Sequence, residues 1–292
     1  MKKINFFTVF VFIIVSGLLI SLNSCKPKGK NIGLQLYSLR DSIKKDVPGT
    51  IKKVAEIGYK FVEPAGYSDG KFYGMEPAAF RALCEENDLF VLSSHAGRPA
   101  PDSTNYEETM AWWDKCIDAH VAVGVKYIVQ PSMGRTAYES LEGLKAYCDY
   151  FNEVGAKCNA KGIRFGYHNH SKEFTTVFDS TIILYDYLAE NTDPAKVILQ
   201  LDLYWCVEGG KNPVDYINKY PGRFELWHIK DKEEIGASGI MDFASIWAVS
   251  EKSGMKYGIV EVEQYNFDTF TSVDSSLVFL NEAEYIVMPE NE

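Results

Sequence analysis

Eight short apolar or aromatic runs recur along the chain, and their spacing constrains the fold more than any other feature. Successive runs begin 27 to 37 residues apart, and each is too short to form a helix. Several are rich in Val, Ile, Tyr and Phe, a composition that favours strands. The sequence therefore predicts eight strands, at residues 32–37, 59–63, 89–94, 126–130, 163–167, 197–201, 224–228 and 257–261.

The segments between these runs have the spacing of amphipathic helices. In segment 50–57, for example, Ile51, Val54 and Ile57 lie three residues apart, on one face of a helix. Several segments end in a glycine directly before the next strand, a common helix stop; these glycines are Gly58, Gly124, Gly162 and Gly254. Eight alternating units of about 30 residues predict an α/β fold, a single-domain (β/α)8 TIM barrel. A dinucleotide-binding open sheet is excluded, because no G-x-G-x-x-G follows the first strand.

The first 30 residues differ from the rest of the chain. A basic start precedes an apolar run over residues 6–20, which is shorter than the roughly 20 residues of a membrane-spanning helix. Leu-Asn-Ser then precedes Cys25 and resembles the bacterial lipobox. We predict a signal peptide at 1–24, a lipidated Cys25 with a polar tether at 25–30, and the barrel at 31–292. The protein is thus expected to be an exported bacterial lipoprotein, membrane-anchored in the periplasm or at the cell surface. The simpler alternative is an ordinary signal peptide with an incidental cysteine.

The net charge and the cysteines exclude some partners and some kinds of site. The whole chain has a formal charge of −10, and cleavage before Cys25 leaves 28 basic against 40 acidic residues, or −12. Nucleic-acid partners are not expected, because phosphate contacts require Lys and Arg. The other five cysteines include no C-x-x-C pair, so we expect small buried side chains rather than disulfides or a zinc knuckle. They are Cys84, Cys116, Cys148, Cys158 and Cys206.

Polar residues gather where the predicted strands end, which is where TIM barrels carry their active sites. Four of the five histidines lie there, and the fifth, His120, lies in a predicted helix and is expected to be structural. Imidazoles and carboxylates converging from several strands indicate a divalent metal such as Zn, Mn, Mg or Co. Each residue alone has a simpler explanation: a packed histidine, a helix cap at Asp202, a solvated pair at Lys230 and Asp231. The set comprises Glu63, His95, Gln130, His168, Asn169, His170, Asp202, His228, Lys230, Glu261 and Glu263.

Five motifs resemble the sugar phosphate isomerase/epimerase family, whose members are xylose isomerase-like TIM barrels related in fold to endonuclease IV. They are Gly-Leu-Gln-Leu-Tyr-Ser-Leu-Arg at 33–40, Gly-Tyr-His-Asn-His-Ser-Lys-Glu-Phe at 166–174, Leu-Asp-Leu-Tyr-Trp at 201–205, His-Ile-Lys-Asp at 228–231 and Val-Glu-Gln at 262–264. The resemblance covers residues 31 to 285. It implies a superfamily rather than a substrate.

The resemblance also implies a set of metal ligands. Asp202, His228 and Glu263 match positions that hold the metal in relatives. Many relatives have Glu-Asn-His where this chain has His-Asn-His from His168, so His168 stands where a glutamate usually ligates and acts as a base. Three alternatives remain: His168 ligates directly, Glu173 reaches back to the metal, or the metal has an altered set of ligands.

We therefore expect a metal-dependent enzyme that moves a proton on an unphosphorylated sugar, keto-sugar or glycoside. Isomerisation, epimerisation and β-elimination or hydration, as on 3-keto-glycosides, share that step, and an exported eliminase would act with a partner sugar oxidoreductase. The catalytic residues are predicted to be His95, His168, His170, Lys230 and Glu261, and the substrate-binding residues to be Gln35, Glu63, Tyr204 and Trp205. The alternative is a non-catalytic carbohydrate-binding lipoprotein with a relict site. DNA repair ranks last because of the acidic charge and the export signal.

Overall fold

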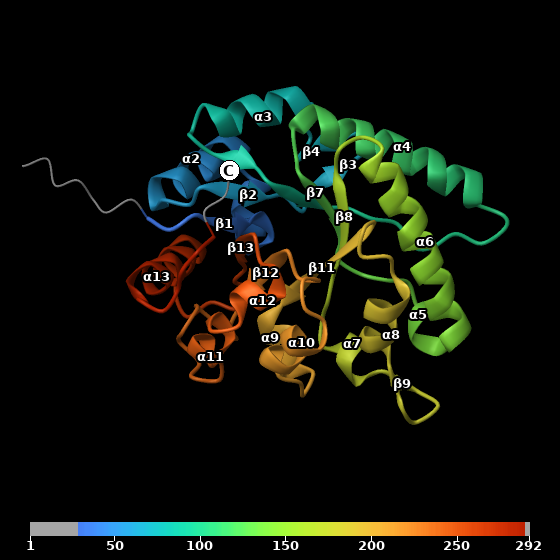
Figure 1. The fold of residues 1–292 in the computed structure, drawn as a ribbon. Coiled ribbons are helices and arrows are strands. Elements are labelled where there is room, and N and C mark those ends of the chain that lie inside the picture. Colours follow the sequence, from blue (N-terminus) through green and yellow to red (C-terminus); the bar gives the residue numbers. More distant parts are fainter. Residues whose placement is uncertain (1–28, 290–292) are drawn as a thin grey trace, which may run out of the picture.

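The computed structural model describes residues 29–289, so the predicted signal peptide and Cys25 lie outside the described residues. A parallel sheet forms the centre of the fold, and helices surround it (Figure 1). All eight predicted strands are present, and the third is divided into two short pieces. The strands are β1 (Ile32–Gln35), β2 (Phe61–Glu63), β5 (Phe90–Val91) with β6 (Ser93–His95), β7 (Tyr127–Gln130), β8 (Arg164–His168), β11 (Val197–Asp202), β12 (Leu226–Ile229) and β13 (Tyr257–Val260).

The sheet forms a closed barrel, and two junctions between strands complete it. β1 pairs with β2 on one side and with β13 on the other, so the first and last strands are neighbours. At the other junction, Leu92 joins β5 to β6. Its backbone N–H donates to the carbonyl of Val62 at 3.1 Å, and its carbonyl accepts from the backbone of Lys126 at 2.8 Å. The predicted single-domain (β/α)8 barrel is thus confirmed.

The helices lie outside the strands, and in Figure 1 the last helix, α13, lies beside the first elements of the chain. The predicted glycine stops are confirmed, since Gly58, Gly124, Gly162 and Gly254 all have the positive φ that favours glycine. The helices are the 3-10 turn η1 (Leu36–Leu39), α1 (Arg40–Ile43), α2 (Val47–Ile57), α3 (Pro77–Glu85), α4 (Tyr106–Val123), α5 (Thr136–Glu139), α6 (Leu141–Asn159), α7 (Lys172–Thr175), α8 (Leu184–Asn191), α9 (Leu203–Glu208), α10 (Pro213–Lys219), α11 (Phe243–Trp247), α12 (Ser250–Ser253) and α13 (Thr269–Glu282). Two antiparallel hairpins, β3 (Tyr67–Ser68) with β4 (Lys71–Phe72) and β9 (Val177–Phe178) with β10 (Ile182–Ile183), interrupt the connections.

Two apolar cores result from this arrangement. The larger lies between the helices and the strands, and the smaller fills the inside of the barrel. The inner core requires a glycine at position 33, because a Cβ there would lie 2.1 Å from the ring of Phe61. Its members are Phe61, Leu92, Tyr127, Val129, Ile198, Leu226, Tyr257 and Ile259.

Several smaller predictions are also confirmed. The five described cysteines are free and buried. His120 is structural: its Nδ1 lies 2.7 Å from the carbonyl of Cys116 one turn earlier in α4, and burial lowers its pKa to about 4. Several strand boundaries differ from the prediction by one or two residues. β1, for example, ends at Gln35 and not at Tyr37, because the Gln35 side chain accepts from the N–H of Tyr37 and η1 begins there.

The N-terminal end of the described chain is fastened to α13. The Lys30 ammonium donates to the carbonyls of Leu280 and Ala283 at 2.6 and 2.7 Å, where the last helix ends. Lys30 was assigned to the tether, yet it packs on the barrel two residues before β1 begins. Among residues 29–289, no helix combines the length and apolar character needed to cross a bilayer.

Candidate active site

A layer of polar side chains lies above the inner apolar core, at the carboxyl ends of the strands. Residues two apart on a strand share a face, so Gln200 follows Ile198, His228 follows Leu226 and Glu261 follows Ile259 toward the mouth of the barrel. The members of this layer are buried or nearly so. They are Gln35, Glu63, His95, His168, Gln200, Asp202, His228 and Glu261.

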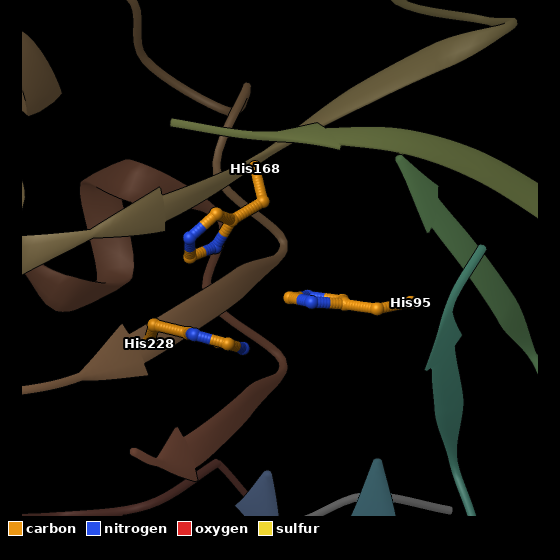
Figure 2. A group of neighbouring side chains, drawn as sticks. All are labelled: His95, His168 and His228. Atoms are coloured by element: carbon orange, nitrogen blue, oxygen red, sulfur yellow. The ribbon is translucent and has the colours of Figure 1, made fainter. Parts of the chain in front are cut away.

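Four of these residues could hold a metal ion. Each of these residues offers one side-chain nitrogen or oxygen, and the four atoms lie within 4.8 Å of one another. The residues are His168, Asp202, His228 and Glu261, and all four are buried. A second, overlapping group replaces the two carboxylates with His95. Figure 2 shows the three imidazoles of that second group converging from different strands. The structure thus brings together His168, Asp202 and His228, three of the four expected ligands.

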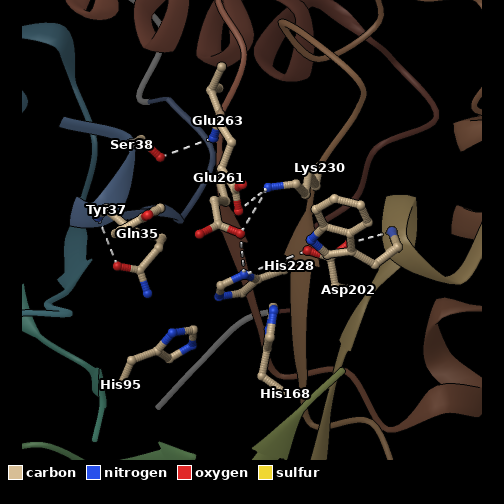
Figure 3. A network of polar contacts seen from close by, with 12 residues as sticks. Gln35, Tyr37, Ser38, His95, His168, Asp202, His228, Lys230, Glu261 and Glu263 are labelled. Carbon is tan, nitrogen blue, oxygen red and sulfur yellow. Dashed lines mark hydrogen bonds and ion pairs between the residues drawn. The ribbon is translucent and has the colours of Figure 1, made fainter. Parts of the chain in front are cut away.

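Glu261 occupies the place that the sequence analysis assigned to Glu263. The backbone of Glu261 still continues the sheet, with its N–H donating to the carbonyl of Ile229 at 3.2 Å. Its carboxylate lies 3.3 Å from Nδ1 of His228 and 3.2 Å from the ammonium of Lys230 (Figure 3). Glu263 lies one step farther toward solvent and pairs with Lys230 at 2.8 Å, outside both groups of candidate ligands.

Asp202 supplies the best evidence that the residues fit a metal. Its Oδ1 accepts from the backbone N–H of Trp205 at 2.8 Å and caps α9, as the simpler reading of this residue proposed. Its Oδ2 is buried without a hydrogen-bond partner, which is costly for a carboxylate oxygen. Burial raises the pKa of Asp202 to about 7, against the opposing charges of Lys230 and His228. Two imidazoles and two carboxylates form a donor set that suits Zn or Mn.

The two histidines of this group have opposite protonation preferences. Burial, and then the positive charge of His228, hold the pKa of His168 well below its usual range, so His168 is the neutral imidazole that a metal requires. Burial also acts to lower the pKa of His228, but the carboxylates of Glu63 and Glu261 outweigh it and raise the pKa to about 10. Metal binding at His228 must therefore release a proton from its Nδ1.

Glu173, the alternative ligand after strand 5, is engaged elsewhere. Its Oε1 accepts from the hydroxyls of Tyr138, at 2.7 Å, and Tyr167. Its Oε2 accepts from the backbone N–H of His170 at 3.0 Å. It is buried and belongs to neither group of candidate ligands. The geometry therefore favours His168 itself as the strand-5 ligand.

A cavity of about 510 Å³ opens next to this group. Its lining includes the histidines and carboxylates His95, His168, His170, Glu261 and Glu263. The loops after β1, β2, β6 and β7 supply the rest, including several residues that the sequence analysis did not select; these are Tyr37, Tyr67, Arg98, Pro99, Pro131 and Met133. Apart from Tyr37, which lies in the motif at 33–40, no motif included them, because the path of a loop over a barrel mouth does not follow from periodicity.

None of the four predicted substrate-binding residues is among those that line this cavity. Gln35 and Glu63 are fully buried beneath it. Tyr204 is buried and its hydroxyl turns to Glu208 at 3.4 Å. The ring of Trp205 packs 5.7 Å from that of His170, between centroids.

Of the predicted catalytic residues, four line the cavity and Lys230 does not. Lys230 is buried and is held between Glu261 and Glu263. Burial opposes its charge, but those two carboxylates and Asp202 outweigh this effect and raise its pKa, so it remains an ammonium. Lys230 is therefore a fixed positive charge in contact with both carboxylates.

Known proteins resemble this chain over most of its length. The family model for the xylose isomerase-like TIM barrel matches residues 51–283. A sugar phosphate isomerase/epimerase structure from Parabacteroides distasonis is 32% identical, with a TM-score of 0.82, and the match covers 89% of this chain and 100% of that one.

Among curated proteins, an inosose dehydratase of Lacticaseibacillus casei is 27% identical over 253 residues, or 73% of this chain and 81% of the relative. One from Geobacillus kaustophilus is 23% identical over 64% of this chain and 65% of its own length. These matches confirm the expectation of an enzyme of the isomerase, epimerase or lyase type. The chain belongs to the sugar phosphate isomerase/epimerase family of xylose isomerase-like TIM barrels.

Proposed function

We propose that this protein is a divalent-metal-dependent enzyme that removes a proton next to the carbonyl of an unphosphorylated keto-sugar or keto-glycoside and then eliminates or adds at the neighbouring carbon. The observation that carries the proposal is the buried group of His168, Asp202, His228 and Glu261, with one carboxylate oxygen of Asp202 left without a partner, beside a cavity of about 510 Å³. A cavity of this size suits a small molecule.

The charges around the cavity favour a substrate without phosphate. Arg98 is the one Lys or Arg side chain that lines it within the described part of the chain, and its guanidinium is already paired with Glu108 at 3.0 Å. Glu263, a carboxylate outside the candidate metal group, also lines the cavity. A phosphate dianion would thus find one basic side chain there, already paired with a carboxylate, whereas phosphate sites depend on basic side chains or backbone N–H groups.

A bound divalent ion would act as a Lewis acid toward the carbonyl of the sugar. The imidazole of His170 lines the cavity, and its ring nitrogens have no hydrogen-bond partner among the described residues, so we assign it the role of base. In an elimination, the base takes the proton from carbon, the C–H electron pair forms a C=C bond, and the adjacent C–O bond breaks. The leaving oxygen takes a proton, which the imidazolium of His170 formed in the first step can return within the same cavity. The relatives named dehydratases fit this form of the chemistry.

The test combines metal analysis with product analysis. Purified protein should contain a divalent metal, and the loaded protein should convert a member of a panel of sugars, keto-sugars and 3-keto-glycosides, whereas chelator-treated protein should not. Turnover of phosphorylated sugars alone would contradict the proposed substrate class. Tight sugar binding without turnover by metal-loaded protein would instead establish a carbohydrate-binding protein with a relict site.

We further propose that the enzyme is an exported lipoprotein that works with a sugar oxidoreductase supplying the keto-sugar. Cys25→Ala is expected to yield protein that no longer partitions with membranes, because the lipid is attached through that thiol. Detergent phase partitioning of the two proteins measures this. Equal partitioning of the variant and the native protein would refute the lipid anchor and leave the barrel chemistry unaffected.

A further inference from the structure

Glu63 is a fully buried carboxylate in contact with five side chains that can donate hydrogen bonds. Its Oε1 lies 2.7 Å from Nε2 of Gln35, 2.7 Å from Nε2 of His228 and 3.0 Å from Nε2 of His95. Its Oε2 accepts from the hydroxyl of Ser93 and from Nε2 of Gln200, the latter at 3.0 Å. An ionised carboxylate can only accept hydrogen bonds, so every neighbour must present a proton to it.

This requirement fixes the orientation of Gln200. Because the amide nitrogen of Gln200 donates to Glu63, its carbonyl oxygen points the other way and can only accept. That oxygen lies 2.9 Å from Nε2 of His95 and 3.1 Å from Nδ1 of His168. Both of these ring nitrogens must therefore carry a proton.

The remaining ring nitrogens follow from the same logic. A neutral imidazole has one N–H and one lone pair, so the lone pair of His168 is on Nε2 and that of His95 is on Nδ1. His228 carries a proton on Nε2, which faces Glu63. Its other nitrogen, Nδ1, faces Glu261 at 3.3 Å and Asp202 at 3.9 Å, where the candidate metal group lies.

We infer that the buried Glu63–Gln200 pair selects the ring nitrogens that His95, His168 and His228 present to the metal and the substrate. Glu63 acts on the reaction only through these imidazoles, so it is a positioning residue and not a substrate contact. The inference rests on the proposed function for its consequence, metal binding, but not for the tautomers themselves. Carboxylates that orient metal-bound histidines in this way are worth about 10- to 100-fold in metal affinity.

The decisive variant is Glu63→Gln, which keeps the size of the side chain but replaces one acceptor oxygen with a donor. With its oxygen still facing His228, the new amide nitrogen would meet the amide nitrogen of Gln200, so Gln200 must turn over. Its nitrogen would then face Nδ1 of His168, which must become an acceptor. We expect the proton of His168 to move to Nε2, and the affinity for Zn²⁺ or Mn²⁺ to fall about 10- to 100-fold.

Two further variants separate positioning from general stability. Glu173→Gln alters another buried carboxylate at the mouth, one that touches none of the three imidazoles, and should leave their tautomers unchanged. The exchange Glu63→Gln with Gln200→Glu reverses the contact: the new amide nitrogen at position 63 donates to a carboxylate at position 200, whose other oxygen again accepts from Nδ1 of His168. It should restore both the His168 tautomer and the metal affinity. Recovery in the exchanged protein would not be expected if Glu63 merely filled space.

The measurement is histidine ¹⁵N NMR on metal-free protein, followed by a titration with Zn²⁺ or Mn²⁺. Native protein should show His168 with its proton on Nδ1, and finding it on Nε2 would overturn the inference even if the Glu63→Gln protein failed to fold. Unchanged tautomers in a folded Glu63→Gln protein would also overturn it. Because the spectra need no metal, a native protein that binds no metal would refute the proposed function while leaving the assignment of tautomers standing.

Discussion

Replacing His228 with alanine is expected to abolish turnover and to weaken metal binding by at least about 100-fold, more than loss of an outer hydrogen-bond partner would. His228 is fully buried, and its Nδ1 lies 3.3 Å from the carboxylate of Glu261 and 3.9 Å from that of Asp202. Without it, the two carboxylates and Glu63 lose their shared positive partner. The unfolding free energy should fall by roughly 1–3 kcal/mol, because Glu63 loses a buried hydrogen bond.

The matched control is His120→Ala, which removes the one described histidine outside the mouth. His120 is also fully buried, in α4, where its ring packs 4.8 Å from that of Tyr67 and 5.0 Å from that of Phe72, between centroids. Its loss should lower stability but leave metal affinity nearly unchanged. Metal titration and thermal unfolding of both variants give the comparison. Equal metal affinity in native protein and the His228 variant would remove His228 from the site.

The second large effect is expected at Glu261. Glu261→Gln should reduce metal affinity by at least about 10-fold, since a neutral amide replaces a charged ligand beside His228 and Lys230. Glu263→Gln should change the affinity by less than about 3-fold, because Glu263 lies outside both groups of candidate ligands and reaches them only through Lys230.

These two glutamates form a close comparison, since both pair with Lys230 and both line the cavity. A general loss of negative charge would therefore affect the two variants alike. The affinities come from titration with Mn²⁺ or Zn²⁺, with turnover on the same preparations. A larger loss at Glu263 than at Glu261 would restore the ligand set that the family resemblance implied.

The barrel could be predicted from the sequence because local signals and global topology agree. The apolar runs occur once per βαβ unit, and glycines such as Gly58 and Gly124 end helices in the left-handed conformation that disfavours other residues. Smaller irregularities could not be predicted. Leu92 divides the third strand, and Gln35 ends the first early, and both depend on hydrogen bonds to neighbouring chain segments or side chains.

The site residues could be predicted where the alternation of side chains along a strand decides which of them point into the barrel. His168, Asp202 and His228 each occupy inward positions at strand ends, and the structure brings them together. This alternation cannot distinguish Glu261 from Glu263, because residues two apart on a strand face the same way. Which of the two glutamates reaches the metal group depends on its height along the barrel axis, and that height depends on where β13 ends relative to β12.

The supporting residues were harder to find. Gln200 lies within a run of apolar residues and reads as an ordinary strand position, yet it contacts two imidazoles and Glu63. Its role becomes visible only when the four strands that carry these side chains are placed around the barrel. Arg98 lies on a loop, where side-chain direction has no period to follow.

The fastening of Lys30 to the end of α13 has a consequence for how the enzyme would meet its substrate. Lys30 directly precedes the amino end of β1, and in a parallel barrel that end lies on the face opposite the cavity. Four residues lie between Cys25 and Lys30, and the five Cα-to-Cα steps reach at most about 18 Å. A lipid on Cys25 would thus hold the barrel close to the bilayer with its closed floor toward the lipid headgroups. The open mouth would face the surrounding medium, so that sugars could enter from solution without approaching the membrane.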